Sequence, residues 1–347
     1  MYSSSPFIFS LLLLLSIPAI FYVAPRILPP KTLPAIPDLD EADDLALFRR
    51  ATLSSSSSLR LPPPPSPPKI AFLFLTNSDL SFAPLWELFF RGHHRSFNLY
   101  IHLDPNSKLN YSLLTPSFVG RFIPAKATQR GSPTLISAAR RLLAAALLDD
   151  PSNAFFALIS QHCVPLHSFR IAYRTLFSSP RLPSHRRKSF IEIVAHEPNL
   201  MNRYVARGDG FMLPEIPFED FRVGSQFFVL ARRHAVAVVR DRRLWKKFRV
   251  PCLKAREDSC YPEEHYFPTL LSMQDSEGCT HYTLTRVNWT GSVGGHPHLY
   301  GPGEVTADLV RELRRSNSTY SYLFARKFAP ACLEPLMRIA ESVILCD

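Results

Sequence analysis

The chain has 347 residues and a formal net charge of +11 at pH 7, with 32 prolines and only 12 glycines. This length allows one large domain or two small ones, and the positive charge suits an anionic partner: nucleic acid, a membrane surface or a phosphorylated ligand. The scarcity of glycine argues against glycine-rich phosphate loops, and the sequence contains neither G-x-G-x-x-G nor G-x-x-x-x-G-K-[ST].

The chain begins with a long apolar run. Residues 7–24 read FIFSLLLLLSIPAIFYVA and carry no charge. Such a run is just long enough to span a lipid bilayer. The apolar region of a signal peptide is usually shorter, although Ser16 and Pro18 leave cleavage open. We therefore predict that residues 1–25 form a short tail and an uncleaved transmembrane anchor.

The orientation of this anchor follows from conflicting signals. Arg26 and Lys31 follow the apolar run, and by the positive-inside rule they disfavour a lumenal C-terminal part. Three N-glycosylation sequons and six cysteines favour the lumen, where glycans are attached and disulfides form. The sequons begin at Asn110, Asn288 and Asn317. We predict a single-pass type II protein with a lumenal C-terminal domain.

Residues 26–68 have the composition of a stem. This segment contains five consecutive serines at 54–58 and PPPPSPP at 62–68. Such a tract is expected to form an extended, semi-rigid spacer, with one possible short helix at Asp40–Arg50. An anchor, a stem and a globular domain at residues 69–347 together make the architecture of a Golgi-resident enzyme, so we expect the protein in the Golgi membrane.

The globular part opens with two predicted strands. KIAFLFLT at residues 69–76 is apolar on both faces, as expected for a central parallel strand. NLYIHLD at residues 98–104 follows, and its polar residues His102 and Asp104 come at its carboxyl end. Ligands of open α/β sheets bind at that edge.

The elements that follow alternate between helix and strand. The clearest helix has Ser132 as a cap, Pro133 in its first turn and Pro151 at its end. Shorter runs predict a helix at 84–90 and strands at 154–160, 190–194, 225–230 and 280–287. The alternation predicts an α/β domain, mostly parallel, with helices on both sides of the sheet.

A basic stretch and an acidic motif stand out in the second half. Residues 232–249 form a basic helix that buries Val236, Val239 and Trp245; its cations are either solvated or bind an acidic acceptor. CYPEEHYFPTLL at residues 260–271 holds two adjacent carboxylates between prolines. Because consecutive residues cannot share a helix face, one acid should face a pocket while the other faces solvent or a cation. A charged first helical turn remains the alternative.

Several familiar sites are absent from the sequence. There is no H-E-x-x-H, no G-x-S-x-G and no C-x-x-C, and the only D-x-D, Asp38-Leu39-Asp40, lies in the stem. A metal-bridged diphosphate is therefore not expected in the globular domain. Without a metal, a leaving nucleoside diphosphate needs fixed cations, and Arg326-Lys327 offers two. Arg286 and Trp289 lie at another strand end, where the tryptophan either stacks on a sugar or belongs to the core.

Seven sequence blocks resemble one family. In order they read KIAFLFLT, YIHLD, IPA…SPTLISAARRLL, FRVGSQFFVL, CYPEEHYFPTLL, LTRVNWTG and YLFARKF. This order resembles the core-2/I-branching β-1,6-N-acetylglucosaminyltransferase family in its plant branch, from about Lys69 to Asp347. The resemblance implies a GT-A-like fold and a metal-independent, inverting transfer from a UDP-sugar to a glycan.

The resemblance also implies roles for individual residues. It places the catalytic base at Glu264, and we predict the neighbouring Glu263 on the acceptor side. Lys327 would bind the diphosphate, with Arg286 or Arg326 as a second cation, and Gly224-Ser225 would form a turn beside the site. His102 and Asp104 would lie on the donor side and Trp289 near the acceptor sugar.

Departures from the family pattern leave some questions open. The pattern W-G…A-E reads Arg130-Gly131…Ala138-Ala139 here, and Cys163 stands where relatives often carry an acid. The resemblance implies that the donated sugar is similar to GlcNAc, GlcA or Xyl and that the acceptor is a glycan on a glycoprotein or a cell-wall polymer. One alternative is an inactive relative that binds carbohydrate or acts as a scaffold. Another is a basic nucleic-acid-binding protein, which the anchor and the sequons argue against; we expect no nucleic acid.

Overall fold

The computed structural model describes residues 10, 13–18, 31–58, 67–177, 187–292 and 295–347. The predicted anchor at residues 7–24 lies largely outside these residues. No helix within the described ranges combines the length and the apolar character needed to cross a membrane.

The core of the fold is a six-stranded sheet in the order β2-β1-β3-β6-β5-β7. Strand β1 pairs in parallel with β2 and β3, and β5 pairs in parallel with β7, whereas β6 is antiparallel to both of its neighbours. The prediction of an α/β fold with a mostly parallel sheet is therefore confirmed. The strands are β1 (Lys69–Thr76), β2 (Phe97–Leu103), β3 (Asn153–Ser160), β5 (Ser189–Glu192), β6 (Val229–Ala231) and β7 (Cys279–His281).

A smaller second sheet has the order β4-β9-β8. It consists of β4 (Val164–Pro165), β8 (Thr285–Val287) and β9 (Phe324–Arg326). The predicted single strand at 280–287 is wrong, because β7 and β8 belong to different sheets. His281 adopts a φ of 64°, a left-handed conformation that turns the chain out of the first sheet.

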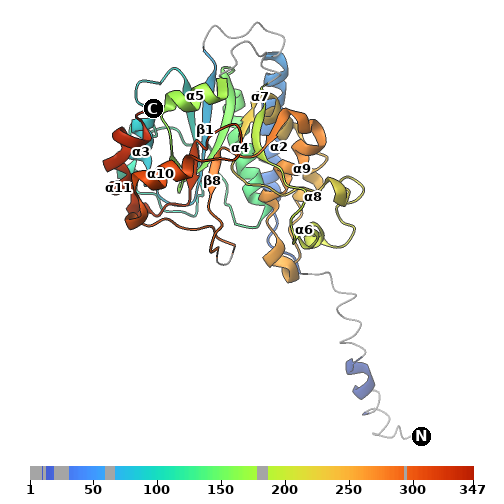
Figure 1. Ribbon diagram of the computed structural model, residues 1–347. Helices are drawn as coiled ribbons and strands as arrows, with labels where there is room; N and C mark the ends of the chain where they lie inside the picture. The colour runs from blue at the N-terminus through green and yellow to red at the C-terminus, as the bar shows by residue number, and fades with distance from the viewer. Residues whose placement is uncertain (1–9, 11–12, 19–30, 59–66, 178–186, 293–294) are drawn as a thin grey trace, which may run out of the picture.

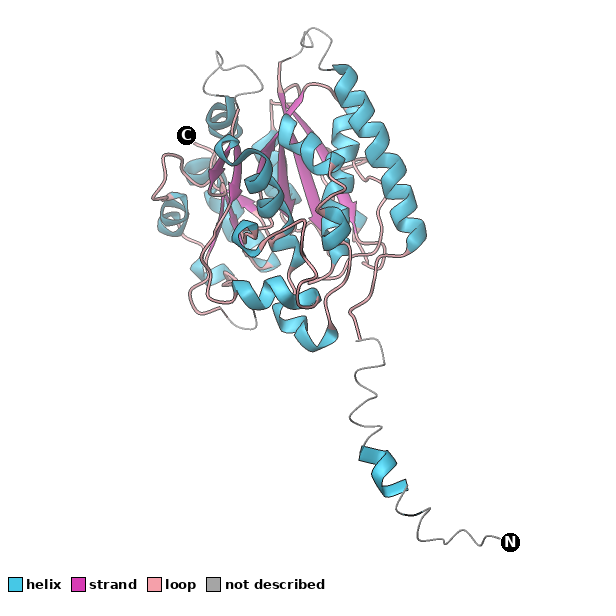
Figure 2. Ribbon diagram, turned by 90° about the vertical axis from the view of Figure 1, so that its right-hand side faces the viewer, coloured by secondary structure: helices cyan, strands magenta, loops and turns pink. Residues whose placement is uncertain are grey.

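Strand β1 builds a hydrophobic core on each of its faces because successive side chains alternate. Ala71 and Leu73 pack into one core, with residues of helices α4 and α9. Phe72 and Phe74 pack into the other, an aromatic cluster centred on Trp86 of α3. Figure 2 shows the strands enclosed between helices, as this double burial requires. The helices of eight or more residues, besides α2, are α3 (Ala83–Phe90), α4 (Pro133–Asp149), α5 (Phe169–Phe177), α7 (Arg232–Arg240), α9 (Tyr266–Asp275) and α10 (Ala307–Arg314).

Helix α4 begins as the sequence predicts. The hydroxyl of Ser132 accepts a hydrogen bond from the backbone N–H of Thr134, and Pro133 occupies the first turn. The predicted basic helix at 232–249 is instead two helices, α7 and α8 (Trp245–Phe248). Helix α7 ends at Arg240, and the Asp241 carboxylate accepts hydrogen bonds from the backbone N–H groups of Leu244 and Trp245, which holds the turn between the two helices.

The cations of this basic stretch are mostly engaged with the protein itself. Lys247 pairs with Glu215 at 2.9 Å, and Arg249 pairs with Glu41. These ion pairs favour the interpretation of a solvated structural surface over that of an acceptor-binding one. Trp245 is buried as predicted, and Val236 is half-buried.

Part of the predicted stem belongs to the folded domain. The possible short helix at Asp40–Arg50 is in fact α2 (Asp38–Ser58), which packs against α4 and α7 (Figure 1). Phe48 and Ala51 are buried in the core, and the Arg141 guanidinium pairs with the buried Asp44 carboxylate at 2.8 Å. An unpaired buried charge is costly, so this pair strongly favours the docked helix.

The chain is attached to the domain even before α2. Thr32 forms a β-bridge with Leu253, and the N–H of Leu33 donates to the carbonyl of Cys252 at 2.8 Å. The folded domain therefore begins before the predicted boundary at residue 69. The segment before residue 69 is rich in serine and has few apolar residues, so its sequence did not indicate a packed helix.

Candidate active site

Two cavities adjoin at the carboxyl ends of β1 and β3. The first, which we name the Lys327 cavity, has a volume of about 590 Å³ and includes Thr76, Asn77, Gln161 and His162 in its wall. The second, the Arg203 cavity, has a volume of about 540 Å³. The residues that line both are Gln226, Phe227, Glu264, Trp289 and Arg326.

The adjacent acids point in different directions, as predicted. Both lie in a short 3₁₀ turn, Pro262–Glu264, whose first residue is proline. Glu264 is half-buried, and its Oε2 accepts a hydrogen bond from Nη1 of Arg203 at 2.8 Å. Glu263 is only 4% exposed. Both acids form the first turn of this 3₁₀ element, in line with the alternative of a charged first turn, whereas the first turn of α9 carries no acid.

Arg203 is a site residue that the sequence did not reveal. It lies on the short helix α6 (Leu200–Tyr204), with its guanidinium 5.2 Å from the centre of the Tyr261 ring and 3.9 Å from Glu197. A single arginine in a short, mixed segment carries no pattern that marks it. Only the fold brings it to Glu264.

The backbone around Glu264 is held by a close contact. The N–H of Gly224 donates to the carbonyl of Glu264 at 2.9 Å. A Cβ atom at position 224 would lie 2.0 Å from the carbonyl oxygen of Glu192, a distance that no side chain tolerates. Ser225 adds a hydrogen bond from its N–H to Oε2 of Glu192 at 2.8 Å. The Gly224-Ser225 turn is therefore a support for Glu264.

Glu263 supports the site from behind. Its Oε1 accepts the N–H of Gly131 at 3.3 Å, whereas its buried Oε2 has no hydrogen-bond partner among the described residues. Burial, helped by the charge of Glu264, raises the pKa of Glu263 to about 7. The structure places Glu263 in the lining of the Lys327 cavity and not in that of the Arg203 cavity; its role on the acceptor side stays a prediction.

This pKa predicts a pH-dependent stability. The folded state holds the Glu263 proton more tightly than the unfolded chain, whose carboxyl titrates near the ordinary value of 4.5. Glu263 therefore stabilises the fold fully below the unfolded pKa, and this stability is lost as the pH rises through 7. Glu263→Gln should gain stability relative to the unchanged protein between pH 5 and pH 8. Thermal unfolding at both pH values measures this gain, and an equal difference at the two pH values would contradict it.

A disulfide fixes the approach to the acidic motif. Cys252 and Cys260 are bonded, and Cys260 lies directly before Tyr261. Gly131 packs against this segment with a φ of 70°, and a Cβ there would meet the Cys260 carbonyl at 2.7 Å. The remaining cysteines are free: Cys163, Cys279 and Cys332 are buried, and Cys346 is exposed.

Cations outnumber carboxylates in the lining of the Lys327 cavity, which includes Arg130, Arg326 and Lys327 together with Glu263 and Glu264. Arg326, at the end of β9, is half-buried, lies 4.4 Å from the Phe227 ring centre and has a buried Nε without a hydrogen-bond partner among the described residues. Burial lowers the pKa of Lys327, and the charges of Arg326 and Arg130 lower it further. Within the described ranges, Lys327 makes neither an ion pair nor a side-chain hydrogen bond. Because the cations outnumber the carboxylates, the lining keeps a positive charge, and the cavity suits an anionic ligand.

The other predicted donor-side residues lie elsewhere. His102 and Asp104 do not line the Lys327 cavity; Asp104 instead accepts the N–H and hydroxyl of Thr128, at 2.7 and 2.6 Å. His102 is buried, and burial lowers its pKa to about 4. Both residues thus hold the loop that carries Thr128. Arg286 lines the Arg203 cavity and lies over the Tyr322 ring, so the structure does not bring it to Lys327.

Trp289 and the sequons have distinct surroundings. Trp289 is 53% exposed at the border of both cavities, which excludes the interpretation as a core residue. Asn110 and Asn317 are exposed. Asn288 is half-buried beside Trp289, and its Oδ1 accepts the N–H of Thr290 at 2.9 Å.

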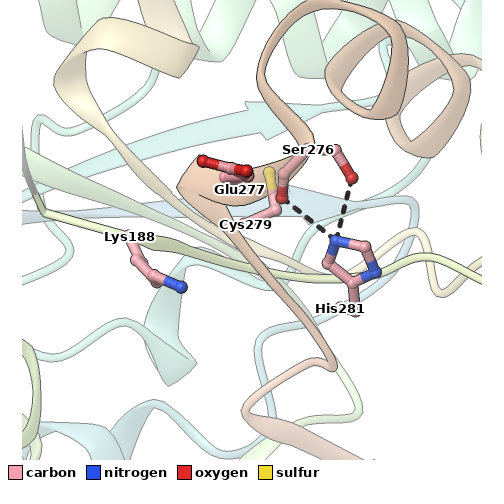
Figure 3. Close-up of a pocket in the computed structure, with 5 residues that line it drawn as sticks. All are labelled: Lys188, Ser276, Glu277, Cys279 and His281. Carbon is pink, nitrogen blue, oxygen red and sulfur yellow. Dashed lines mark hydrogen bonds between the residues drawn. The ribbon is translucent and has the colours of Figure 1, made fainter.

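A separate hollow at the edge of the sheet offers little chemistry. Figure 3 shows its lining, in which the His281 ring bonds to the hydroxyl and carbonyl of Ser276. Burial raises the pKa of the Cys279 thiol to about 12, so it stays protonated at neutral pH. In the described part of the chain, no group of three or more His, Cys, Asp or Glu side chains is placed to hold a metal ion.

Two adjoining cavities that share the Glu264 carboxylate are compatible with a group-transfer enzyme, which binds two substrates that meet at a reactive group. Residues 70–314 match the sequence model of the Core-2/I-Branching enzyme family, which covers most of the chain, and the protein belongs to this family. It is 30% identical over 310 residues to Glycosyltransferase BC10 from Oryza sativa subsp. japonica, an alignment that covers 76% of this chain and 74% of the rice protein.

The predicted family resemblance is thus confirmed, and the protein is a glycosyltransferase. Membership implies a nucleotide-sugar donor and a glycan acceptor. Lys327 lies outside the matched residues 70–314, so its role depends on the geometry of the cavity.

Proposed function

We propose that the protein transfers a sugar from a UDP-sugar to a hydroxyl group of a glycan, with inversion and without a metal ion. The observation that carries this proposal is the position of Glu264, which lies where the Lys327 cavity and the Arg203 cavity meet. A base at such a junction can reach a hydroxyl from one side while the donor sugar lies on the other.

Glu264 is arranged to act as the general base. Arg203 binds its Oε2, whereas Oε1 makes no hydrogen bond with any residue that the structure describes. In a single displacement, the acceptor hydroxyl attacks the anomeric carbon opposite the leaving diphosphate. A sugar hydroxyl is a weak nucleophile, so a carboxylate must take its proton as the new bond forms. Oε1 is the atom available for that proton.

The cations of the Lys327 cavity are suited to the leaving group. As the bond to the sugar breaks, negative charge develops on the diphosphate, and preorganised cations stabilise it. Lys327 and Arg326 supply such charge from the protein. His162 contributes a neutral ring, because burial and the charge of Lys327 lower its pKa to about 4.

The two cavities separate the substrates. Asn77 and Gln161, whose side chains share a hydrogen bond of 2.7 Å, lie at the strand ends and offer polar groups to a uracil or ribose. Trp289 offers an aromatic face to an acceptor sugar, and Glu192 and Arg286 in the Arg203 cavity offer polar partners. An inactive carbohydrate-binding relative would need neither a base at the junction nor unpaired cations beside it.

We expect the protein to hydrolyse one UDP-sugar or to transfer its sugar, and we expect this activity to persist in excess EDTA. The full-length protein, purified in detergent, is incubated with UDP-GlcNAc, UDP-GlcA, UDP-Xyl and the corresponding GDP-sugars, and the release of nucleoside diphosphate is measured. Activity with GDP-sugars alone would refute the UDP-sugar assignment. Complete loss in EDTA, restored by manganese, would refute metal independence.

The location of this activity is part of the proposal. The apolar run at 7–24 and the sequons support a type II protein with its catalytic domain in the Golgi lumen. Protease treatment of intact microsomes tests it, with and without detergent. A domain that is digested without detergent and carries no glycan would overturn this topology.

A further inference from the structure

A third cation faces the Lys327 cavity from a different part of the fold. Arg130 lies in the loop before α4, whereas Arg326 and Lys327 lie at the end of β9. All three line the same cavity. Neither the family match nor the relative assigns a role to Arg130.

The backbone that carries Arg130 is fixed on both sides. Thr128, two residues earlier, is bonded to the Asp104 carboxylate through its N–H and its hydroxyl. Gly131, the next residue, donates its N–H to Glu263 and is packed against Cys260 of the disulfide. A guanidinium on such a support is preorganised, so little entropy is lost when it binds a ligand.

The side chain of Arg130 is oriented by uncharged groups. Its guanidinium lies 5.4 Å from the Tyr261 ring centre, Nη2 donates to the carbonyl of Gly295 at 2.7 Å, and Nη1 lies 2.7 Å from Nε2 of His296. Arg130 forms no ion pair with any residue in the described ranges. A guanidinium has five N–H donors, so donors remain for a ligand.

The three cations of this cluster repel one another, and they outnumber the two carboxylates, Glu263 and Glu264, that line the same cavity. The charges of Arg326 and Arg130 both act on Lys327, where after burial they lower the pKa further. Burial lowers the pKa of His296, and the charges of Arg130, Lys327 and Arg326 do so as well. A diphosphate would relieve this repulsion, and a planar guanidinium can bind two phosphate oxygens at once.

We propose that Arg130 binds the diphosphate of the donor together with Lys327 and Arg326. This inference rests on the proposed function in its choice of donor. It assigns one cation of the diphosphate site to the loop before α4, in addition to Arg326 and Lys327 at the end of β9. Arg130 would thereby anchor the donor from the side of Glu263.

Inorganic pyrophosphate is the probe that tests this role without a nucleoside. Calorimetric titration of the full-length protein compares the unchanged chain with Arg130→Gln and with Arg95→Gln, an exposed arginine before the amino end of β2. We expect Arg130→Gln to weaken pyrophosphate binding about tenfold, the usual worth of a hydrogen bond to a charged group. Arg95→Gln should leave the affinity unchanged.

A charge-conserving variant guards against a merely structural effect. Arg130→Lys keeps the charge and should recover part of the pyrophosphate affinity. An affinity no better than that of Arg130→Gln, or an unchanged affinity in Arg130→Gln, would overturn the inference. Titrations with UDP separate the role of Arg130 from the proposed UDP-sugar donor. If pyrophosphate bound in an Arg130-dependent manner but UDP did not bind, the UDP-sugar donor would be refuted and the role of Arg130 would stand.

Discussion

Glu264→Gln should slow sugar transfer by roughly 10²- to 10⁴-fold, the usual worth of a general base. Glutamine keeps the size of the side chain and can still bond to Arg203 through its carbonyl oxygen, but it cannot take the proton of the acceptor hydroxyl. The diphosphate is bound by cations elsewhere in the Lys327 cavity, so UDP should bind with nearly unchanged affinity. Steady-state kinetics and UDP titration of the same preparations measure both quantities.

The neighbouring acid provides the matched control. Glu263 is buried, bonds to the N–H of Gly131, and is already partly protonated near neutral pH, because burial raises its pKa to about 7. Glu263→Gln removes a charge that is only partly present near neutral pH and should retain most of the transfer rate. If Glu263→Gln abolished transfer and Glu264→Gln did not, the general base would be Glu263 and not Glu264.

Lys327→Ala should lower kcat/KM for the donor by roughly 10²- to 10³-fold, as loss of one preorganised charge-stabilising group commonly does. The Lys327 side chain makes no hydrogen bond or ion pair in the described ranges, so its removal deletes a ligand contact and leaves no buried anion unpaired. Because the charge of the diphosphate grows as the sugar leaves, kcat should fall as well as the donor affinity. Initial rates at varied donor concentration separate the two effects.

Lys188→Ala is the control for this variant. Lys188 is an exposed lysine in the hollow of Figure 3, away from Glu264, and its loss should leave both kinetic constants unchanged. Equal effects of the two substitutions would show that Lys327 acts only through the net charge of the protein. An unchanged donor KM and kcat in Lys327→Ala would remove it from the site.

The predictions from sequence succeed where a segment carries its own pattern. The strand at residues 69–76 is apolar on both faces, and the helix after Ser132 has a cap, a first-turn proline and a continuous apolar stripe. Both segments adopt the predicted structure in the fold, because the sheet is buried on both faces and their apolar side chains pack there. The acidic motif was also recognisable, since two adjacent carboxylates between prolines are unusual.

The sequence fails where the fold brings distant residues together. Arg203 lies 61 positions before Glu264, and Arg130 meets His296 across 166 positions. His102 and Asp104 were expected in the donor site from their place at a strand end, yet their side chains bind the neighbouring loop instead. A strand end locates the correct edge of the sheet, but the direction of each side chain depends on which loop covers it.

The early attachment of the chain at Lys31–Leu33 limits how far the enzyme can stand from a membrane. The N–H of Lys254 donates to the carbonyl of Lys31 at 2.8 Å, so the domain is reached seven residues after residue 24. If residues 7–24 span the bilayer as proposed, the free tether measures at most about 25 Å even when fully extended. The attachment point adjoins the disulfide loop that leads to Glu264. The catalytic centre would therefore lie close to the lipid surface. Acceptor glycans far from the membrane could reach it only by moving toward that surface.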